Sequence, residues 1–189
     1  MEVIKLKKIT LFLTLVGSLF ADPKFYVGSS YGVVEESFSN VEAKSSTDIA
    51  KVKIGYGVRE AYAIEISCDY IKNKAKIFSS DEKTTVDGDK FGVNVDVIKA
   101  FDFNTMILPF IKAGFGSGSL SINRVSQDKL FYGSFNLATG IFIPINNNFD
   151  LELGYEYKHI SYESIDTIVE KIKYESNTNI AYFGFNVRF

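Results

Sequence analysis

The sequence contains one pattern of side chains that could form a covalent catalytic site. His159 and Ser161 are two residues apart, so they point to the same side of an extended strand. Three glutamates follow them, at Glu163, Glu170 and Glu175. A serine, a histidine and a carboxylate can act as nucleophile, base and orienting group. One interpretation is therefore a hydrolase, and the alternative is that this histidine is an interfacial side chain without a chemical role.

Other kinds of chemistry find no support in the residue types. The chain has one histidine and one cysteine, Cys68, which excludes a metal site built on two imidazoles, a cysteine pair and an intrachain disulfide. No glycine-rich phosphate loop precedes a helix. We therefore predict no cofactor and no metal. The formal net charge of −2 leaves no basic excess, so we expect no nucleic-acid partner.

The first residues have the three-part pattern of a secretory signal peptide. Residues 1–8 are mostly basic, residues 9–20 are apolar, and Ala21 ends the run. The apolar run is too short to span a bilayer. We predict a signal peptide at 1–21 and a single domain at 22–189. Leu19 departs from the small-residue rule for cleavage, and a buried N-terminal helix is the alternative.

After the leader, apolar and polar residues alternate with a period of two, which is the period of a β-strand. Residues 149–157 are an example, with aromatic and leucine side chains on one face and acidic residues and glycine on the other. The pattern predicts eight strands, at 25–34, 49–58, 61–71, 90–100, 106–116, 130–143, 149–160 and 179–189. Pro109 lies inside the fifth, where we expect a strand end or a bulge.

The predicted connections alternate in length. Those at 59–60, 101–105 and 144–148 are tight, whereas those at 35–48, 72–89, 117–129 and 161–178 are long and polar. Short periplasmic turns and long extracellular loops are typical of outer-membrane barrels. We predict an all-β fold, an eight-stranded antiparallel up-and-down transmembrane β-barrel. The alternative is a soluble eight-stranded barrel with its apolar face inside.

In a membrane barrel the polar face must line a narrow interior, because a charge on the lipid face costs about 2–4 kcal/mol at mid-bilayer. This face carries glycines and equal numbers of basic and acidic residues, which predict an ion-pair network in the lumen. Hairpin register would set Lys53 opposite Glu65, or Lys51 opposite Asp69. The predicted network comprises Lys51, Lys53, Glu65, Asp69, Asp96, Lys112, Glu152, Glu156, Lys158 and Arg188. We expect the aromatic residues near strand ends, Tyr26 among them, to form a girdle at the membrane boundaries.

The leader, the alternating strands, the 151–157 strand (LELGYEY) and the last residues, 183–189 (FGFNVRF), resemble the small outer-membrane β-barrel family. This family includes the OmpA transmembrane domain, OmpX and the opacity-type surface proteins. The resemblance implies a Gram-negative outer membrane, with lipid and lipopolysaccharide as neighbours. It also implies that the terminal strand is an assembly signal for the barrel-assembly machinery, through Phe183, Phe185, Val187 and Phe189.

The resemblance is weaker for activity than for fold. His159 and Ser161 are similar to the pair in lipid A deacylases, but residues 162–164 (YES) stand where those enzymes carry an Asn-Ala-Gly stretch. We expect a non-enzymatic structural or surface-interaction protein, with any extracellular ligand bound by loops 35–48, 72–89, 117–129 and 161–178. The alternatives are a small porin-like channel and a lipid A deacylase-like hydrolase.

Overall fold

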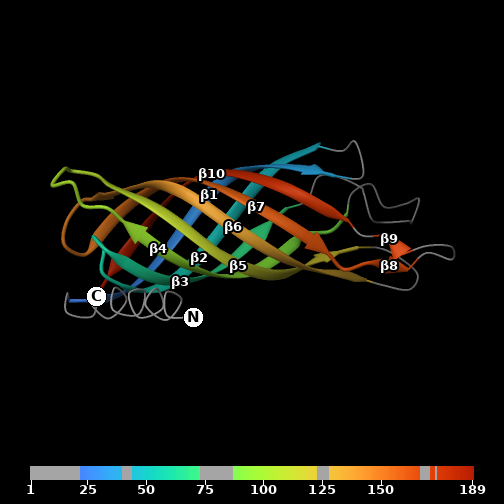
Figure 1. Cartoon of the computed structure of the whole chain (residues 1–189), viewed down its shortest axis with the longest axis horizontal. Coiled ribbons are helices and arrows are strands. Elements are labelled where there is room, and N and C mark those ends of the chain that lie inside the picture. Colours follow the sequence, from blue (N-terminus) through green and yellow to red (C-terminus); the bar gives the residue numbers. More distant parts are fainter. Residues whose placement is uncertain (1–21, 40–43, 73–86, 123–127, 167–170, 173) are drawn as a thin grey trace, which may run out of the picture.

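The computed structural model of the chain is a closed antiparallel barrel (Figure 1). It describes residues 22–39, 44–72, 87–122, 128–166, 171–172 and 174–189. The predicted signal peptide at 1–21 lies outside these residues. The wall consists of β1 (Lys24–Phe38), β2 (Lys44–Gly57), β3 (Tyr62–Ile71), β4 (Lys90–Ala100), β5 (Leu108–Ser121), β6 (Lys129–Pro144), β7 (Phe149–Tyr162) and β10 (Glu175–Arg188). The predicted eight-stranded antiparallel fold is confirmed.

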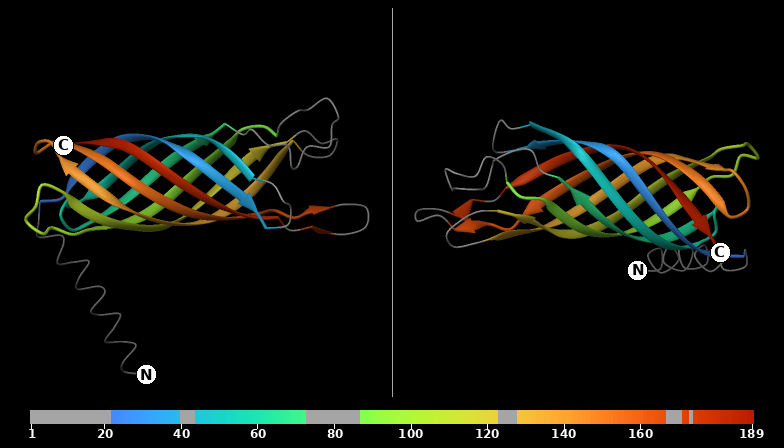
Figure 2. Two further views of the ribbon diagram at one scale, coloured as in Figure 1. Left: turned by 90° about the horizontal axis from the view of Figure 1, so that it is seen from above. Right: turned by 180° about the vertical axis from the view of Figure 1, so that it is seen from behind.

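Each strand of the wall pairs with the next wall strand along the chain, so that β7 pairs with β10. β10 also pairs with β1 and so closes the barrel. In this closing pair, Tyr26 lies opposite Arg188 and Val34 opposite Ile180. A small hairpin, β8 (Ile165–Asp166) and β9 (Lys171–Ile172), lies in the connection between β7 and β10. Figure 2 shows the tight turns and the C-terminus at one end of the barrel, and this hairpin at the other. We call these the turn end and the loop end.

The outer and inner faces of the wall differ in polarity, as the alternating sequence pattern predicted. In β4, the side chains of Val93, Val95 and Val97 are 40–52% exposed on the outside. Asn94 and Asp96, between them, point inward and are 2% and 5% exposed. Apolar residues outside and polar residues inside contradict the alternative of a barrel with an apolar interior along this stretch. No helix in the described part of the chain is long and apolar enough to cross a membrane.

The strands are longer at the loop end than the sequence indicated. β1 continues to Phe38 and β5 to Ser121, while β2 begins at Lys44 and β10 at Glu175. The predicted loops 35–48, 117–129 and 161–178 therefore consist partly of strand. The prediction was wrong there because backbone ladders continue beyond the level at which one face must be apolar, and the alternation then fades. The predicted loop 72–89 does connect β3 and β4. Pro109 is the second residue of β5, at a strand end as expected.

Buried apolar clusters occupy both ends of the interior. At the turn end the cluster includes Tyr26, Phe110 and Phe142, with smaller residues around them. At the loop end, one cluster comprises Leu120, Ile122, Leu130, Tyr132, Ile160 and Tyr162, and another comprises Val34, Ile49, Ile71, Ile180 and Tyr182. Tyr26 was predicted in the outer girdle and this was wrong. It has the same strand parity as the inward Gly28, and its ring points into the barrel.

Candidate functional site

The centre of the barrel is held by two lysines that each lie between two glutamates. The Nζ of Lys53 contacts Glu152 and lies 3.8 Å from Glu65. The Nζ of Lys112 lies 2.6 Å from Glu65 and 3.6 Å from Glu152. These four side chains are almost fully buried, so each charge is compensated by direct contacts and not by water. The residues come from β2, β3, β5 and β7, and the group therefore links opposite parts of the wall.

Two phenols and one amide also donate to these glutamates, the amide being that of Asn186, 3.1 Å from Glu152. Tyr26 donates its hydroxyl hydrogen to Glu65 at 2.8 Å, and Tyr182 donates to Glu152 at 3.0 Å. Each ring lies against a glycine on the neighbouring strand. A Cβ atom at Gly55 would lie 2.2 Å from the ring of Tyr26, and one at Gly154 would lie 2.4 Å from that of Tyr182. The predicted inward glycines thus provide the space in which the tyrosines lie.

A second layer of ion pairs lies nearer the loop end. Lys51 and Asp69 are opposite each other in the β2–β3 ladder, so of the two registers considered, this one is correct. Nevertheless Lys51 Nζ reaches across the interior to Glu156, at 2.6 Å. Asp69 instead pairs with Lys158 at 2.6 Å, and Lys158 also contacts Asn94 Oδ1 at 3.1 Å. Side-chain length and barrel curvature therefore decide the partners here, and ladder register does not.

Asp96 differs from the other members of the predicted set. It is buried beside Asn136, whose Nδ2 lies 3.5 Å from its carboxylate. Within the described part of the chain, no lysine or arginine forms an ion pair with Asp96. The structure therefore brings nine of the ten residues into ion pairs and leaves this carboxylate aside.

A buried ion pair that the sequence pattern did not predict lies close to the loop end. Lys90 Nζ lies 2.5 Å from Glu36. Lys90 is only 1% exposed, so water does not compete for this contact. Tyr162 donates to the same carboxylate at 3.0 Å and Ser176 at 2.6 Å. Glu36 was placed in a loop because the predicted first strand ended at residue 34. Its parity with Gly28 and Gly32 was the signal that could have placed it inside.

At the turn end, two arginines form ion pairs with one carboxylate. Asp150 is fully buried and lies 2.6 Å from Arg188 Nε and 2.8 Å from Arg59 Nη1. Arg59 also donates to the carbonyl oxygen of Asn146 at 2.9 Å, so the β2–β3 and β6–β7 turns are joined. Burial lowers the pKa of Arg59, but its hydrogen bonds to Asp150 and Glu60 outweigh burial and leave this pKa raised. Asp150 shares the face of the predicted network, but the prediction omitted it.

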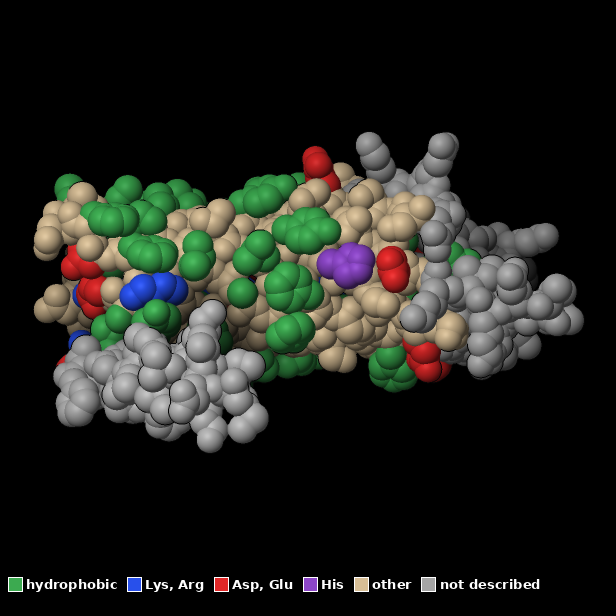
Figure 3. Space-filling model, viewed as in Figure 1, with side chains coloured by type: hydrophobic (Ala, Val, Ile, Leu, Met, Phe, Trp, Pro, Cys, Tyr) green, Lys and Arg blue, Asp and Glu red, His purple; other side chains and the backbone are tan. Residues whose placement is uncertain are grey.

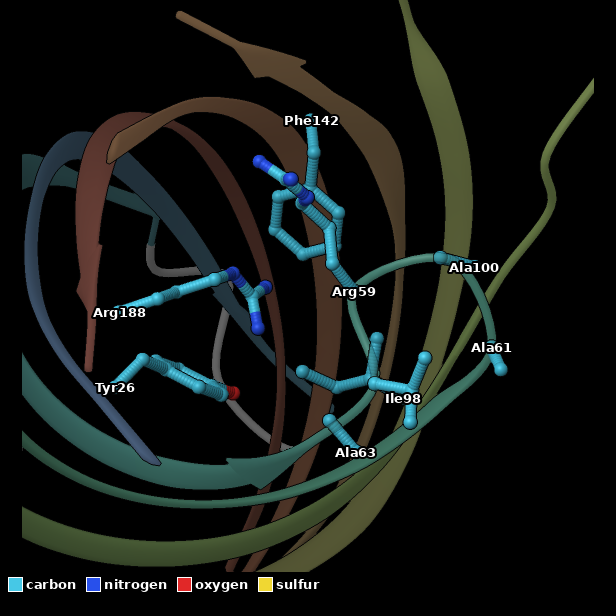
Figure 4. A pocket seen from close by; sticks show the side chains of 9 residues that line it. Tyr26, Arg59, Ala61, Ala63, Ile98, Ala100, Phe142 and Arg188 are labelled. Atoms are coloured by element: carbon cyan, nitrogen blue, oxygen red, sulfur yellow. The ribbon is translucent and has the colours of Figure 1, made fainter. Parts of the chain in front are cut away.

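These side chains close the mouth of the barrel. Figure 4 shows Tyr26 and Arg188 on one side of the mouth and Arg59 reaching in from the β2–β3 turn. The guanidinium of Arg188 lies 4.9 Å from the centre of the Tyr26 ring. The pocket between them has a volume of about 10 Å³, which corresponds to about one water molecule.

His159 and Ser161 lie on the outer surface of β7, where Figure 3 shows the histidine in purple. His159 Nδ1 lies 2.9 Å from Asn177 Oδ1, which also accepts a hydrogen bond from Tyr157 at 2.6 Å. Asn177 thus takes the orienting position that the sequence analysis assigned to a glutamate. The structure shows no hydrogen bond between His159 and Ser161.

The three glutamates of that hypothesis are separated. Glu175 lies directly opposite Ser161 in the β7–β10 ladder, and Glu163 is exposed just beyond the end of β7. Glu170 lies outside the described residues. Among the residues that the structure does describe, no cluster of histidine, cysteine or carboxylate side chains could hold a metal ion.

The residues of the expected assembly signal lie along β10. Phe183, Phe185 and Phe189 are 60%, 41% and 69% exposed on the outer face, and Val187 is half-buried on the same side. The Phe189 amide donates to the carbonyl oxygen of Phe25 at 2.9 Å, which extends the closing ladder. Recognition of this strand by an assembly machinery stays a prediction.

The family model described as "Outer membrane protein beta-barrel domain" matches residues 12–189. The chain belongs to this family. The apolar outer face of this outer-membrane barrel therefore meets lipid, and the bacterial outer membrane is its location. A search of curated proteins found no match.

Solved structures of outer-membrane proteins share the fold. Neisserial surface protein A is 17% identical, with a TM-score of 0.65 over 87% of this chain and 97% of that one. Ail of Yersinia pestis, in complex with the heparin analogue sucrose octasulfate, is 13% identical, with a TM-score of 0.55 over 88% and 99%. OprG of Pseudomonas aeruginosa is 11% identical, with a TM-score of 0.51 over 88% and 95%. At these identities the likeness shows the fold alone.

Proposed function

We propose that the protein is a non-enzymatic outer-membrane barrel that acts at the cell surface, as a structural element and through its loop end. The observation that supports this most is the packed interior. Ion pairs fill the middle, and apolar clusters lie at both ends of the described interior. With the interior occupied, the surface available for a partner in solution is the loop end, where connections lie on a rigid scaffold.

The loop end also has a core of its own. Phe38 and Tyr174 pack against the cluster that contains Leu130, Tyr132 and Tyr162. The ring of Phe38 stacks on that of Tyr162 with centroids 6.2 Å apart. This packing fixes the ends of β1, β7 and β10, from which two of the connections start. A rigid base lowers the entropy lost when a loop binds a partner.

Loop trimming tests the recognition role. Residues 73–86 and residues 167–170 would be replaced by short glycine-serine linkers, which leaves every described strand intact. Adhesion of cells carrying each variant to host cells and to other bacteria would be compared with wild type. We expect adhesion to fall when a loop is trimmed and to be unchanged when the turn at residues 145–148 is replaced. Equal adhesion by all variants would remove the recognition role.

The channel alternative requires a continuous water path. An eight-stranded barrel has an interior just wide enough for its side chains, and here those side chains are in contact across it. We expect planar-bilayer recordings of the purified barrel to show no resolvable current. A reproducible single-channel conductance would contradict the packed interior and support the channel.

A hydrolase is the second candidate, and one observation favours it. Asn177 Oδ1 accepts a hydrogen bond from Tyr157, and a His159 tautomer that donates to the same oxygen from Nδ1 would leave Nε2 as a base on the same face as Ser161. Mass spectrometry of lipid A after incubation with wild type and with Ser161→Ala tests this. Deacylated lipid with wild type alone would establish the hydrolase, and unchanged lipid with both would exclude it for this substrate.

A further inference from the structure

A shallow trough crosses three strands on the outer surface. In the ladders, Gly133 of β6 lies between Ser117 of β5 and Ser161 of β7. Strand parity puts all three on the outer face, and they are much smaller than the nearby outward phenylalanines of β5 and β6. The trough continues into an open groove of about 310 Å³, lined by Phe131, Gly133, Ser161 and Glu163, with the backbone of the residues between them.

Gly133 is unlike the other described glycines. A Cβ atom at each of the others would lie within 2.5 Å of another atom, whereas at Gly133 it would meet nothing within 4 Å. Packing within the chain therefore gives no reason for a glycine here. Its effect is to open a notch in an otherwise bulky surface.

Exposed aromatic rings form the walls of the trough. Phe115 and Phe135 lie on the side of the turn end, with ring centroids 5.5 Å apart and exposures of 71% and 42%. Phe131, 57% exposed, lies on the side of the loop end, and Lys129 follows it on the same face. The trough thus has an apolar side towards the membrane and polar groups on the other, which are Lys129, Glu163 and Glu175, the residue opposite Ser161.

The trough lies at the outer boundary of the membrane. On the outer face of β7, apolar and aromatic residues run from Phe149 to Tyr157, and His159, Ser161 and Glu163 follow. The apolar stretch matches the roughly 9–11 residues that a tilted strand needs to cross the hydrocarbon core. Ser161 and Gly133 are therefore at the level of lipid headgroups, and the groove is continuous with the lipid-facing surface.

We propose that this trough seats one phosphorylated glycolipid of the outer leaflet. Its acyl chains would lie against Phe115 and Phe135, and a sugar ring would enter the notch over Gly133 beside Phe131. Sugar hydroxyls would bind Ser161 and the carboxylate of Glu163, and Lys129 would pair with a phosphate. Exposed apolar patches with a polar rim mark such membrane contacts, and a basic residue near the surface attracts anionic headgroups. The inference does not depend on recognition by the loops.

Native mass spectrometry of the refolded barrel in detergent tests whether the trough binds this lipid. Purified lipid A and phosphatidylglycerol would be titrated into wild type, Gly133→Leu and Ala50→Leu. Leucine at 133 fills the notch, while Ala50→Leu places the same side chain, with one carbon less of added bulk, on the outer face of β2, on the opposite side of the barrel. We expect wild type and Ala50→Leu to bind one lipid A, and Gly133→Leu to bind it about tenfold more weakly, a loss of about 1.4 kcal/mol.

Three further results separate the explanations. Heat-modifiability on a gel confirms that each variant is folded, independently of lipid. Lys129→Gln, an exposed change, should weaken lipid A binding but not binding of its dephosphorylated form. Equal binding of lipid A by wild type and Gly133→Leu would overturn the proposal, and so would equal affinity of wild type for phosphatidylglycerol.

Discussion

The Nε atom of Arg188 donates a hydrogen bond to Asp150 Oδ2 at 2.6 Å, and this contact ties the strand that closes the barrel to its neighbour β7. Because Arg59 binds the other oxygen of the same carboxylate at 2.8 Å, the first turn joins the same group. Three segments distant in sequence are thus connected at the mouth. Asp150 is the residue they share.

Removal of this carboxylate should destabilise the barrel. Asp150→Ala removes the buried partner of Arg188 and leaves Arg59 with only the exposed Glu60, and breaking a buried pair in this way costs about 3–5 kcal/mol. The measurement is urea unfolding in micelles, followed by tyrosine fluorescence or gel mobility. Glu60→Ala is the control, because this exposed partner of Arg59 should contribute about 0–1 kcal/mol. Equal unfolding midpoints for the two variants would contradict the role of Asp150.

Substitution by alanine should lower the stability of the barrel at an inward glycine and raise it at the outward Gly133. Gly154→Ala places a methyl group 2.4 Å from the Tyr182 ring, and such overpacking costs about 1–3 kcal/mol. Gly133→Ala meets open space, and alanine in a strand is about 0.5–1 kcal/mol more favourable than glycine. Unfolding midpoints of both variants against wild type provide the check. A loss of stability at position 133 as large as that at 154 would show that the packing assignment is wrong.

Neutralising an inward carboxylate should destabilise the barrel strongly at one position and weakly at another. Glu152→Gln removes the charge that Lys53 and Lys112 share, and we expect a loss of about 3–5 kcal/mol. Asp96→Asn makes the same chemical change where no ion pair exists in the described structure, and its amide can still bond to Asn136. We expect a clearly smaller loss there, because no ion pair is broken. Unfolding of both variants at neutral pH tests this, and similar losses at the two positions would argue against the observed pairing.

Charge on the outer face should be costly only at membrane depth. Val95→Arg introduces a cation near the middle of β4, where the cost is about 2–4 kcal/mol. Glu35→Arg introduces the same side chain on the outer face of the β1 extension, where the cost is about 0–1 kcal/mol. Folding yield and unfolding midpoint in phospholipid vesicles provide the comparison. Equal tolerance at both positions would mean that the hydrocarbon does not contact Val95.

Much of the fold could be predicted because lipid outside and a polar interior impose a period of two. That period identified every strand of the wall and the face of each side chain in the 149–157 stretch. It could not identify strand ends such as Glu36, because beyond the lipid both faces of a strand can be polar. The ladder hydrogen bonds that hold such residues are made by the backbone, so they do not change the pattern of side-chain types in the sequence.

The partners inside the barrel were less predictable than the residues themselves. Lys51 faces Asp69 across a hairpin, yet its amine contacts Glu156 on the far wall. Cross-barrel distances depend on the stagger of all the strands together, which a pattern within one strand does not contain. Asn177 was missed beside His159 for the same reason, because β7 and β10 meet there only after a long connection.

The strands rise past the lipid before the chain turns back. In β6, the outward face reaches the headgroup level near Gly133, and the strand begins at Lys129, farther from the membrane. The described ends of the strands consequently form a stem that stands clear of the bilayer. Changes to the outward side chains of this stem would therefore leave the paired charges beneath them undisturbed.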